Sequence, residues 1–189
     1  MNRHIILFII SISIIITVAS YDINFFNYEA PIPYSELSEI TWENFRGKNK
    51  PYITMDGIKE FAFITTQIKA SYTPDHKIII TAYFHPSRSY VYNKNVMDAA
   101  TLKHELYHFH ITEIISRKMR KRISNFPENH SFNLSEMLYV YRQSEDSLQH
   151  AYDDETYHSY LLGKQIAWQN KIDSTLLSLE EFSNPIVKK

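Results

Sequence analysis

The chain of 189 residues contains no cysteine. Disulfide bonds and thiol nucleophiles are therefore excluded, and a bound metal ion would have to be held by histidine and carboxylate side chains. The chain also lacks a long basic field, and its formal net charge is -1, so we expect no nucleic-acid partner. No internal repeat or low-complexity tract divides it. With 44% hydrophobic residues, the composition favours one globular domain with a sizeable core.

The first twenty residues differ in composition from the rest. Arg3 precedes an almost wholly apolar run over residues 5–18, and positions 18–20 supply the small residues that a signal peptidase reads. We therefore predict a signal peptide over residues 1–20, cleaved after Ser20, and a secreted or periplasmic domain. The alternative is an uncleaved membrane anchor, for which the run is short. A membrane partner is expected only in that case.

Residues 21–189 are predicted to form a single domain with its core at about residues 40–180. β-Branched and aromatic residues dominate residues 58–72 and again residues 77–84. Residues 73–76, between the two runs, read Thr-Pro-Asp-His, which is typical of a turn. The sequence thus predicts an antiparallel β-hairpin.

Three helical patterns follow the hairpin. The first runs from about residue 96 to 122 without Gly or Pro, and Asn95 is its candidate N-cap. Its basic end, residues 117–122, is interpreted as a solvated helix terminus, where cations complement the helix dipole. Two further patterns cover residues 134–151 and about 154–182, either as two helices or as one helix with a break at their junction.

At the centre of the chain, residues 104–108 read His-Glu-Leu-Tyr-His, the HExxH signature of zinc hydrolases. On a helix, His104 and His108 lie one turn apart on the same face, so both imidazoles can reach one metal ion. Glu105, beside the first histidine, is placed to act on a water that the metal holds. The alternative is an incidental pattern of surface histidines.

A catalytic zinc ion needs three protein ligands and one open position. The nearby His110 and Glu113 project about 240° and about 180° around the helix from His104, so both turn away from the metal. Glu113 is better explained by an ion pair with Arg117, four residues later. The third ligand must therefore come from elsewhere in the chain.

Residues 152–158 read Tyr-Asp-Asp-Glu-Thr-Tyr-His and offer several ligand types together. We expect them at the start of a helix that packs across the motif helix. His158 is the first choice for the third ligand and Glu155 the second, because both residue types suit zinc. Asp153 or Asp154 would then accept the spare ring N–H of a ligating histidine. The alternative is a capped helix start with Asp153 as the N-cap.

The same residues carry a resemblance to a known family. The motif segment and the later cluster resemble the bacterial family catalogued as domain of unknown function 922, whose members are regarded as secreted zinc-dependent proteases. The resemblance spans about residues 40–175 and rests on residues 42–47, 89–91, 103–113, 116–117 and 152–158, Gln165 and Trp168. Two positions depart from the family pattern, since His110 stands where we expect Asp and Ser159 where we expect Gly. The resemblance implies a metallopeptidase and leaves its substrate open.

The predicted fold class is α+β and zincin-like, with a small antiparallel sheet packed on the HExxH helix and a C-terminal helical segment. The predicted function is a secreted zinc-dependent metallopeptidase acting on a peptide or protein substrate. Zn2+ on His104, His108 and His158 would activate a water, and Glu105 would carry the proton of this water to the leaving amine. Two alternatives stay open: a non-catalytic metal-binding protein, and a structural envelope protein with an incidental motif.

Overall fold

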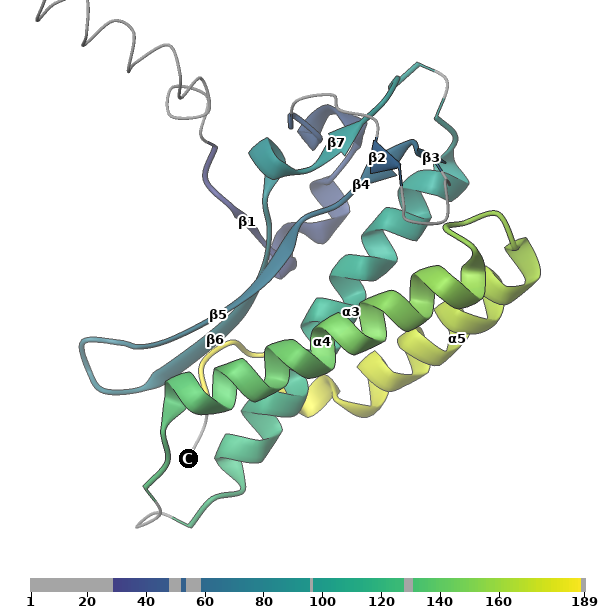
Figure 1. Cartoon of the computed structure of the whole chain (residues 1–189). Helices are drawn as coiled ribbons and strands as arrows, with labels where there is room; N and C mark the ends of the chain where they lie inside the picture. The colour runs from purple at the N-terminus through teal and green to yellow at the C-terminus, as the bar shows by residue number, and fades with distance from the viewer. Residues whose placement is uncertain (1–28, 48–51, 54–58, 96, 128–130, 188–189) are drawn as a thin grey trace, which may run out of the picture. The chain divides into compact units, whose positions relative to one another are not determined.

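Figure 1 shows the computed structural model, which describes residues 29–47, 52–53, 59–95, 97–127 and 131–187. The predicted signal peptide, residues 1–20, lies outside the described residues, and its cleavage after Ser20 stays a prediction. Pro31–Lys189 form one compact unit. Among the described residues, no helix is long and apolar enough to cross a membrane.

The predicted hairpin forms the main part of a three-stranded antiparallel sheet, in the order β1-β6-β5. Strands β5 (Thr66–Tyr72) and β6 (Ile78–Phe84) pair over their full length, and β1 (Ile32–Pro33) pairs with the other side of β6. Burial alternates strictly along β6, as expected of a strand that packs one face on a core. The hairpin prediction is confirmed, although the first strand begins at Thr66 rather than at residue 58.

A change of pairing partner explains the later start. β4 (Ala62–Phe63) pairs with β7 (Tyr90–Val91). The backbone N–H of Thr65 donates to Ser89 Oγ at 2.8 Å, and from Thr66 onward the strand pairs with β6. The remaining short elements are β2 (Tyr52–Ile53), which pairs with β3 (Lys59–Glu60), and the 3-10 turns η1 (Tyr34–Glu39), η2 (Trp42–Asn44), η3 (Pro86–Arg88) and η4 (Glu180–Phe182).

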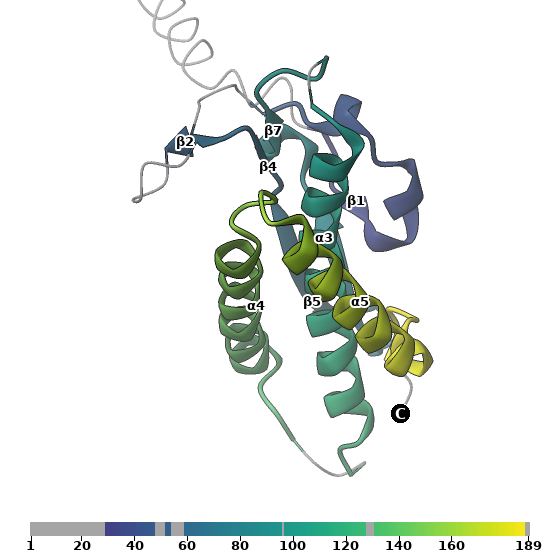
Figure 2. The ribbon, with the colours of Figure 1, turned by 90° about the vertical axis from the view of Figure 1, so that its right-hand side faces the viewer.

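The motif helix α3 (Ala99–Ser124) is the centre of the fold (Figure 2). Its N-cap is Asp98 rather than the predicted Asn95, because the Asp98 carboxylate accepts from the backbone N–H of Thr101 at 2.7 Å. Different sides of α3 join three apolar clusters: one with β4, β6 and β7, one with β5, β6 and α4, and one with α4 and α5. α3 is therefore buried along most of its length.

The basic end of α3 differs from its prediction as a solvated terminus. Arg117 and Arg120 are buried, and both form ion pairs with Glu113. The spacing of the basic residues explains the difference. Arg117 and Arg120 follow Glu113 by four and seven residues, about one and two helical turns, so all three side chains share one face of the helix.

Two helices complete the unit, α4 (Leu134–Thr156) and α5 (Leu162–Ser178), and both flank α3 (Figure 2). The prediction that residues 152–158 begin a helix is wrong, because α4 continues through Asp153 and ends at Thr156. The break lies at residues 157–161 and contains three left-handed residues, with φ of 51° at Tyr157, 48° at His158 and 74° at Ser159. Among the described residues, three α-helices and small antiparallel sheets make the fold α+β, as predicted.

Candidate metal centre

Two stripes of polar side chains face each other where α3 packs on α4. Each stripe repeats every four residues, the spacing that places side chains on one face of a helix. The pairs run in opposite directions along the two helices: His104 with Asp153, His108 with Gln149, and Thr112 with Glu145. An antiparallel helix pair thus builds the site, with the HExxH motif on one helix only.

The two motif histidines and Asp153 bring three ligand atoms together. Nε2 of His104 and Nε2 of His108 lie 3.3 Å apart, and Asp153 Oδ1 lies 3.1 Å from the first and 2.9 Å from the second. Zinc ligands at about 2.0–2.1 Å in a tetrahedral arrangement are about 3.3 Å from one another. The three atoms therefore lie close to the spacing that a tetrahedral zinc ion requires. We call this set of atoms the ligand triangle.

Aromatic packing holds the two imidazoles in place. The fully buried ring of Tyr152 stacks on His104 with 4.6 Å between ring centroids and meets His108 edge-on at 5.0 Å. Trp168 of α5 packs against Tyr152 in turn, at 5.7 Å. Through Trp168, α5 therefore stabilises the position of Tyr152 and, through Tyr152, the positions of the two imidazoles.

The charges of the three ligand residues depend on one another. Burial lowers the pKa of His104 to about 4. Burial acts in the same direction on His108, but the negative charges of Asp153 and Glu105 outweigh it and raise the pKa of His108 to about 9. Burial favours the neutral form of Asp153, yet the two histidines hold the pKa of its carboxyl well below the ordinary value. In the absence of metal, one proton on His108 therefore faces an ionised Asp153.

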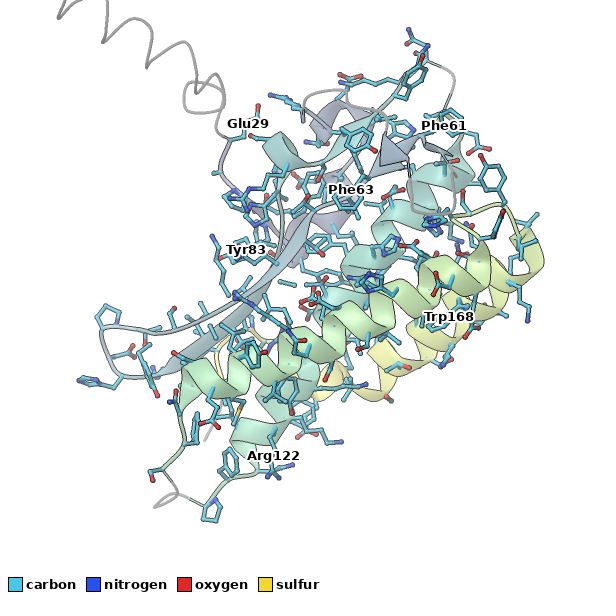
Figure 3. All side chains as sticks on the ribbon, viewed as in Figure 1. Glu29, Phe61, Phe63, Tyr83, Arg122 and Trp168 are labelled. Atoms are coloured by element: carbon cyan, nitrogen blue, oxygen red, sulfur yellow. The ribbon has the colours of Figure 1, made fainter. Side chains whose placement is uncertain are left out.

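The ligand triangle opens on a cleft of about 950 Å³. Residues 61–68, the first turns of α3 and the inner face of α4 line it. Phe61 and Phe63 contribute their side chains on the strand side (Figure 3). Glu105, only 6% exposed, lines the same cleft beside the ligand triangle. The motif glutamate and the ligand atoms therefore share one solvent-connected space.

The two predicted candidates for the third ligand, His158 and Glu155, both lie outside the ligand triangle. His158 lines the cleft, with Nδ1 3.8 Å from Asp153 Oδ1, and is close to the ligand triangle without forming part of it. Glu155 instead accepts a hydrogen bond from Trp168 Nε1 at 2.9 Å. Asp154 is exposed. The ligand triangle thus takes its carboxylate from Asp153, which the sequence suggested only as a hydrogen-bond acceptor.

The sequence does contain a signal for Asp153. Glu145, Gln149 and Asp153 repeat every four residues, the same spacing as His104 and His108. This signal is missed when a helix is expected to begin at residues 152–158, because Asp153 then no longer belongs to the helix that carries Glu145 and Gln149. The other predicted geometry holds, since the His110 ring contacts the Tyr34 hydroxyl and Glu113 pairs with Arg117, away from the ligand triangle.

Comparison with protein-family models, curated proteins and solved structures yields no significant match to this chain. The resemblance to the family catalogued as domain of unknown function 922 stays a prediction. The function is therefore argued from the geometry of the site.

Proposed function

We propose that this chain is a secreted zinc-dependent metallopeptidase of zincin type, in which His104, His108 and Asp153 hold Zn2+. The observation that carries the proposal is the buried ligand triangle at the head of a cleft. The packing of the motif helix on a small antiparallel sheet supports the zincin type. The apolar run at residues 5–18 supports export.

The donor set fits zinc better than a harder cation. Two imidazole nitrogens and one carboxylate oxygen match catalytic zinc sites, which keep a fourth position open. Magnesium and calcium prefer oxygen ligands alone. A bound zinc ion supplies a Lewis acid and lowers the pKa of a water in its open position.

Glu105 is the residue placed to move the proton. It lines the cleft next to the ligand His104, and its charge contributes to the raised pKa of His108. We assign to it the roles of general base toward the attacking water and general acid toward the leaving amine. His158, on the same cleft, is positioned to stabilise negative charge that develops on the substrate carbonyl oxygen.

The form of the cleft favours an extended polypeptide as substrate. In the described sheet β5 pairs with β6 on one side only, and its other side faces α4, where Arg142 Nη2 donates to the backbone oxygen of Ile68 at 2.8 Å. Residues 61–68 line the cleft along this edge. An extended peptide can add to such an edge through main-chain hydrogen bonds. This supports peptide-bond hydrolysis rather than hydrolysis of a small compact molecule.

Zinc stoichiometry and cleavage of casein, measured together for wild type and Glu105→Gln, test the proposal. The Glu105→Gln variant should keep a full equivalent of zinc and lose about 10²- to 10⁴-fold in rate, because the carboxylate carries a proton but holds no metal. The matched control is Glu136→Gln, which neutralises an exposed acid in the first turn of α4 and should keep both properties.

Equal, chelator-sensitive cleavage by wild type and Glu105→Gln would contradict the role of this carboxylate. A wild-type protein that binds no zinc would contradict the whole proposal.

A further inference from the structure

Gln149 connects the ligand His108 to the rest of the polar stripe on α4. Its Nε2 lies 3.0 Å from the backbone oxygen of His108 and 3.2 Å from Thr112 Oγ1, and its Oε1 lies 2.6 Å from His108 Nδ1. A backbone oxygen can only accept, so the amide must turn its NH2 group toward it. The amide oxygen then faces His108 Nδ1, which must carry the hydrogen of this bond.

Thr112 fixes the same orientation of the amide from its other side. A threonine hydroxyl has one hydrogen to donate and two lone pairs. Thr112 Oγ1 lies 2.6 Å from Glu145 Oε1, 2.7 Å from Thr66 Oγ1 and 3.2 Å from the backbone oxygen of His108. The hydrogen goes to Glu145, because a carboxylate only accepts and forms the stronger bond. The two lone pairs are then left to accept from Gln149 and Thr66.

Glu145 ends this chain of hydrogen bonds as a buried carboxylate, 7% exposed. Every donor points toward it: His108 Nδ1 to Gln149, Gln149 to Thr112, and Thr112 to Glu145. Turning the Gln149 amide around would place two acceptors against each other, its own oxygen and the backbone oxygen of His108. The direction of the whole chain is therefore set.

We propose that Gln149, Thr112 and Glu145 form a positioning relay that holds His108 in its Nδ1–H tautomer, with Nε2 turned to the metal. This inference rests on the proposed zinc site and explains how one ligand of that site, His108, is oriented. A carboxylate that orients a ligating histidine directly is common in zinc sites. Here the carboxylate of Glu145 acts at a distance, through a hydroxyl and an amide.

The other motif histidine is held differently. Nδ1 of His104 is buried and has no hydrogen-bond partner among the described residues. Its ring is oriented by stacking on Tyr152. Loss of the relay should therefore disturb His108 and leave the orientation of His104 intact.

Two substitutions at Gln149 test the first link of the relay. Gln149→Met keeps a similar length without an acceptor, and Gln149→Glu keeps an oxygen for His108 Nδ1. The tautomer is read from ¹H–¹⁵N NMR of the imidazole nitrogens in metal-free protein, at a pH at which the same spectra show His108 to be neutral. Wild type and Gln149→Glu should show the Nδ1–H form, and Gln149→Met a mixture of both tautomers.

Zinc affinity, measured by chelator competition, gives a second readout. The dissociation constant should rise about 10- to 100-fold in Gln149→Met and much less in Gln149→Glu. The matched control is Gln143→Met, the same substitution at an exposed position of α4, which should change neither the tautomer nor the affinity.

Thr112→Val tests the remoter part of the relay, because it keeps the shape of the side chain and removes the hydroxyl. Alone it should shift the tautomer and weaken zinc binding, whereas Thr112→Ser should do neither. On the Gln149→Met background Thr112→Val should add nothing to the shift of the tautomer, because Thr112 reaches the His108 ring only through Gln149.

Additive shifts of the tautomer in the double variant would overturn the relay, as would a wild-type tautomer and zinc affinity in Gln149→Met. An equal loss of affinity in Gln143→Met would also overturn it. If Gln149→Met fails to fold, the comparison of Thr112→Val with Thr112→Ser decides the question. If wild type binds no zinc, the metallopeptidase proposal fails, and the tautomer measurement still decides the relay.

Discussion

His108 can hold either a proton or a metal ion at the same nitrogen. Its Nε2 lies 2.9 Å from Asp153 Oδ1, and the hydrogen bond from its Nδ1 to Gln149 leaves Nε2 of the neutral ring without a hydrogen. Two lone pairs repel at this distance, so a proton or a cation between the two residues stabilises the pair. Competition between them makes both folding and metal binding depend on pH.

Metal-free protein should lose stability as the pH rises from 6.5 to 9. The pKa of His108 is raised from 6.5 to about 9 in the folded protein, so its contribution is fully present below pH 6.5 and is lost as the pH passes 9. The loss in the free energy of unfolding should be on the order of 3 kcal/mol. Urea unfolding across this range measures it.

The zinc-loaded protein is the control for this prediction, because zinc takes the place of the proton and the pH dependence should disappear. A metal-free protein with the same stability at both ends of the range would show that His108 and Asp153 are not coupled as described.

Between elements, buried charges tie α3 to the segment that follows α5. Arg117 Nε donates to Glu113 Oε1 at 3.0 Å, and Arg120 Nη2 donates to both Glu113 oxygens at 2.9 Å. The same guanidinium groups reach the backbone oxygens of Leu176 and Ser183, each at 2.9 Å. Glu113 thus balances two buried cations that hold the end of the chain against the motif helix.

Glu113→Gln should lower the free energy of unfolding by about 3–5 kcal/mol, because it leaves the buried Arg120 without a carboxylate and Arg117 with Glu180 alone. Chemical denaturation measures the loss, and the exposed Glu181→Gln on the neighbouring turn should change stability by less than about 0.5 kcal/mol. A similar, small effect of both substitutions would mean that the buried arginines are satisfied without Glu113.

The break between α4 and α5 places Ser159 at φ 74°, a left-handed conformation that glycine adopts without strain. Ser159→Gly should therefore raise the free energy of unfolding by about 0.5–1 kcal/mol and the melting temperature by about 1–4 °C. Ser144→Gly, in the interior of α4, should have the opposite sign, because glycine weakens a helix there. Destabilisation by both substitutions would contradict the left-handed conformation at Ser159.

Across the whole molecule, the sequence predicted those features that depend on local periodicity. The alternation along residues 78–84 and the helical pattern around the HExxH motif both appear where they were expected. The end of α4 could not be located in this way, because residues 157–161 contain neither Gly nor Pro. Since the helix continues through Asp153, that residue and not His158 completes the ligand triangle.

The burial of Arg117 and Arg120 also could not be predicted from the sequence. Their partners beyond Glu113 are the Glu180 carboxylate and backbone oxygens of residues 176–183, and no local pattern predicts a contact across about sixty residues. The sequence of α3 therefore predicts two of the metal ligands. The third ligand and the partners of the buried arginines depend on how α4, α5 and the segment after α5 pack against α3.

The central claim is that His104, His108 and Asp153 hold one zinc ion. Zinc content of the purified protein, determined by elemental analysis for wild type, Asp153→Ala and Asp154→Ala, tests it most directly. The two aspartates are neighbours in the chain, but only Asp153 contributes to the ligand triangle, while Asp154 is exposed. Wild type and Asp154→Ala should each hold one equivalent, and Asp153→Ala should lose it. A wild type without zinc, or an Asp153→Ala variant that keeps its zinc while His158→Ala loses it, would contradict the account.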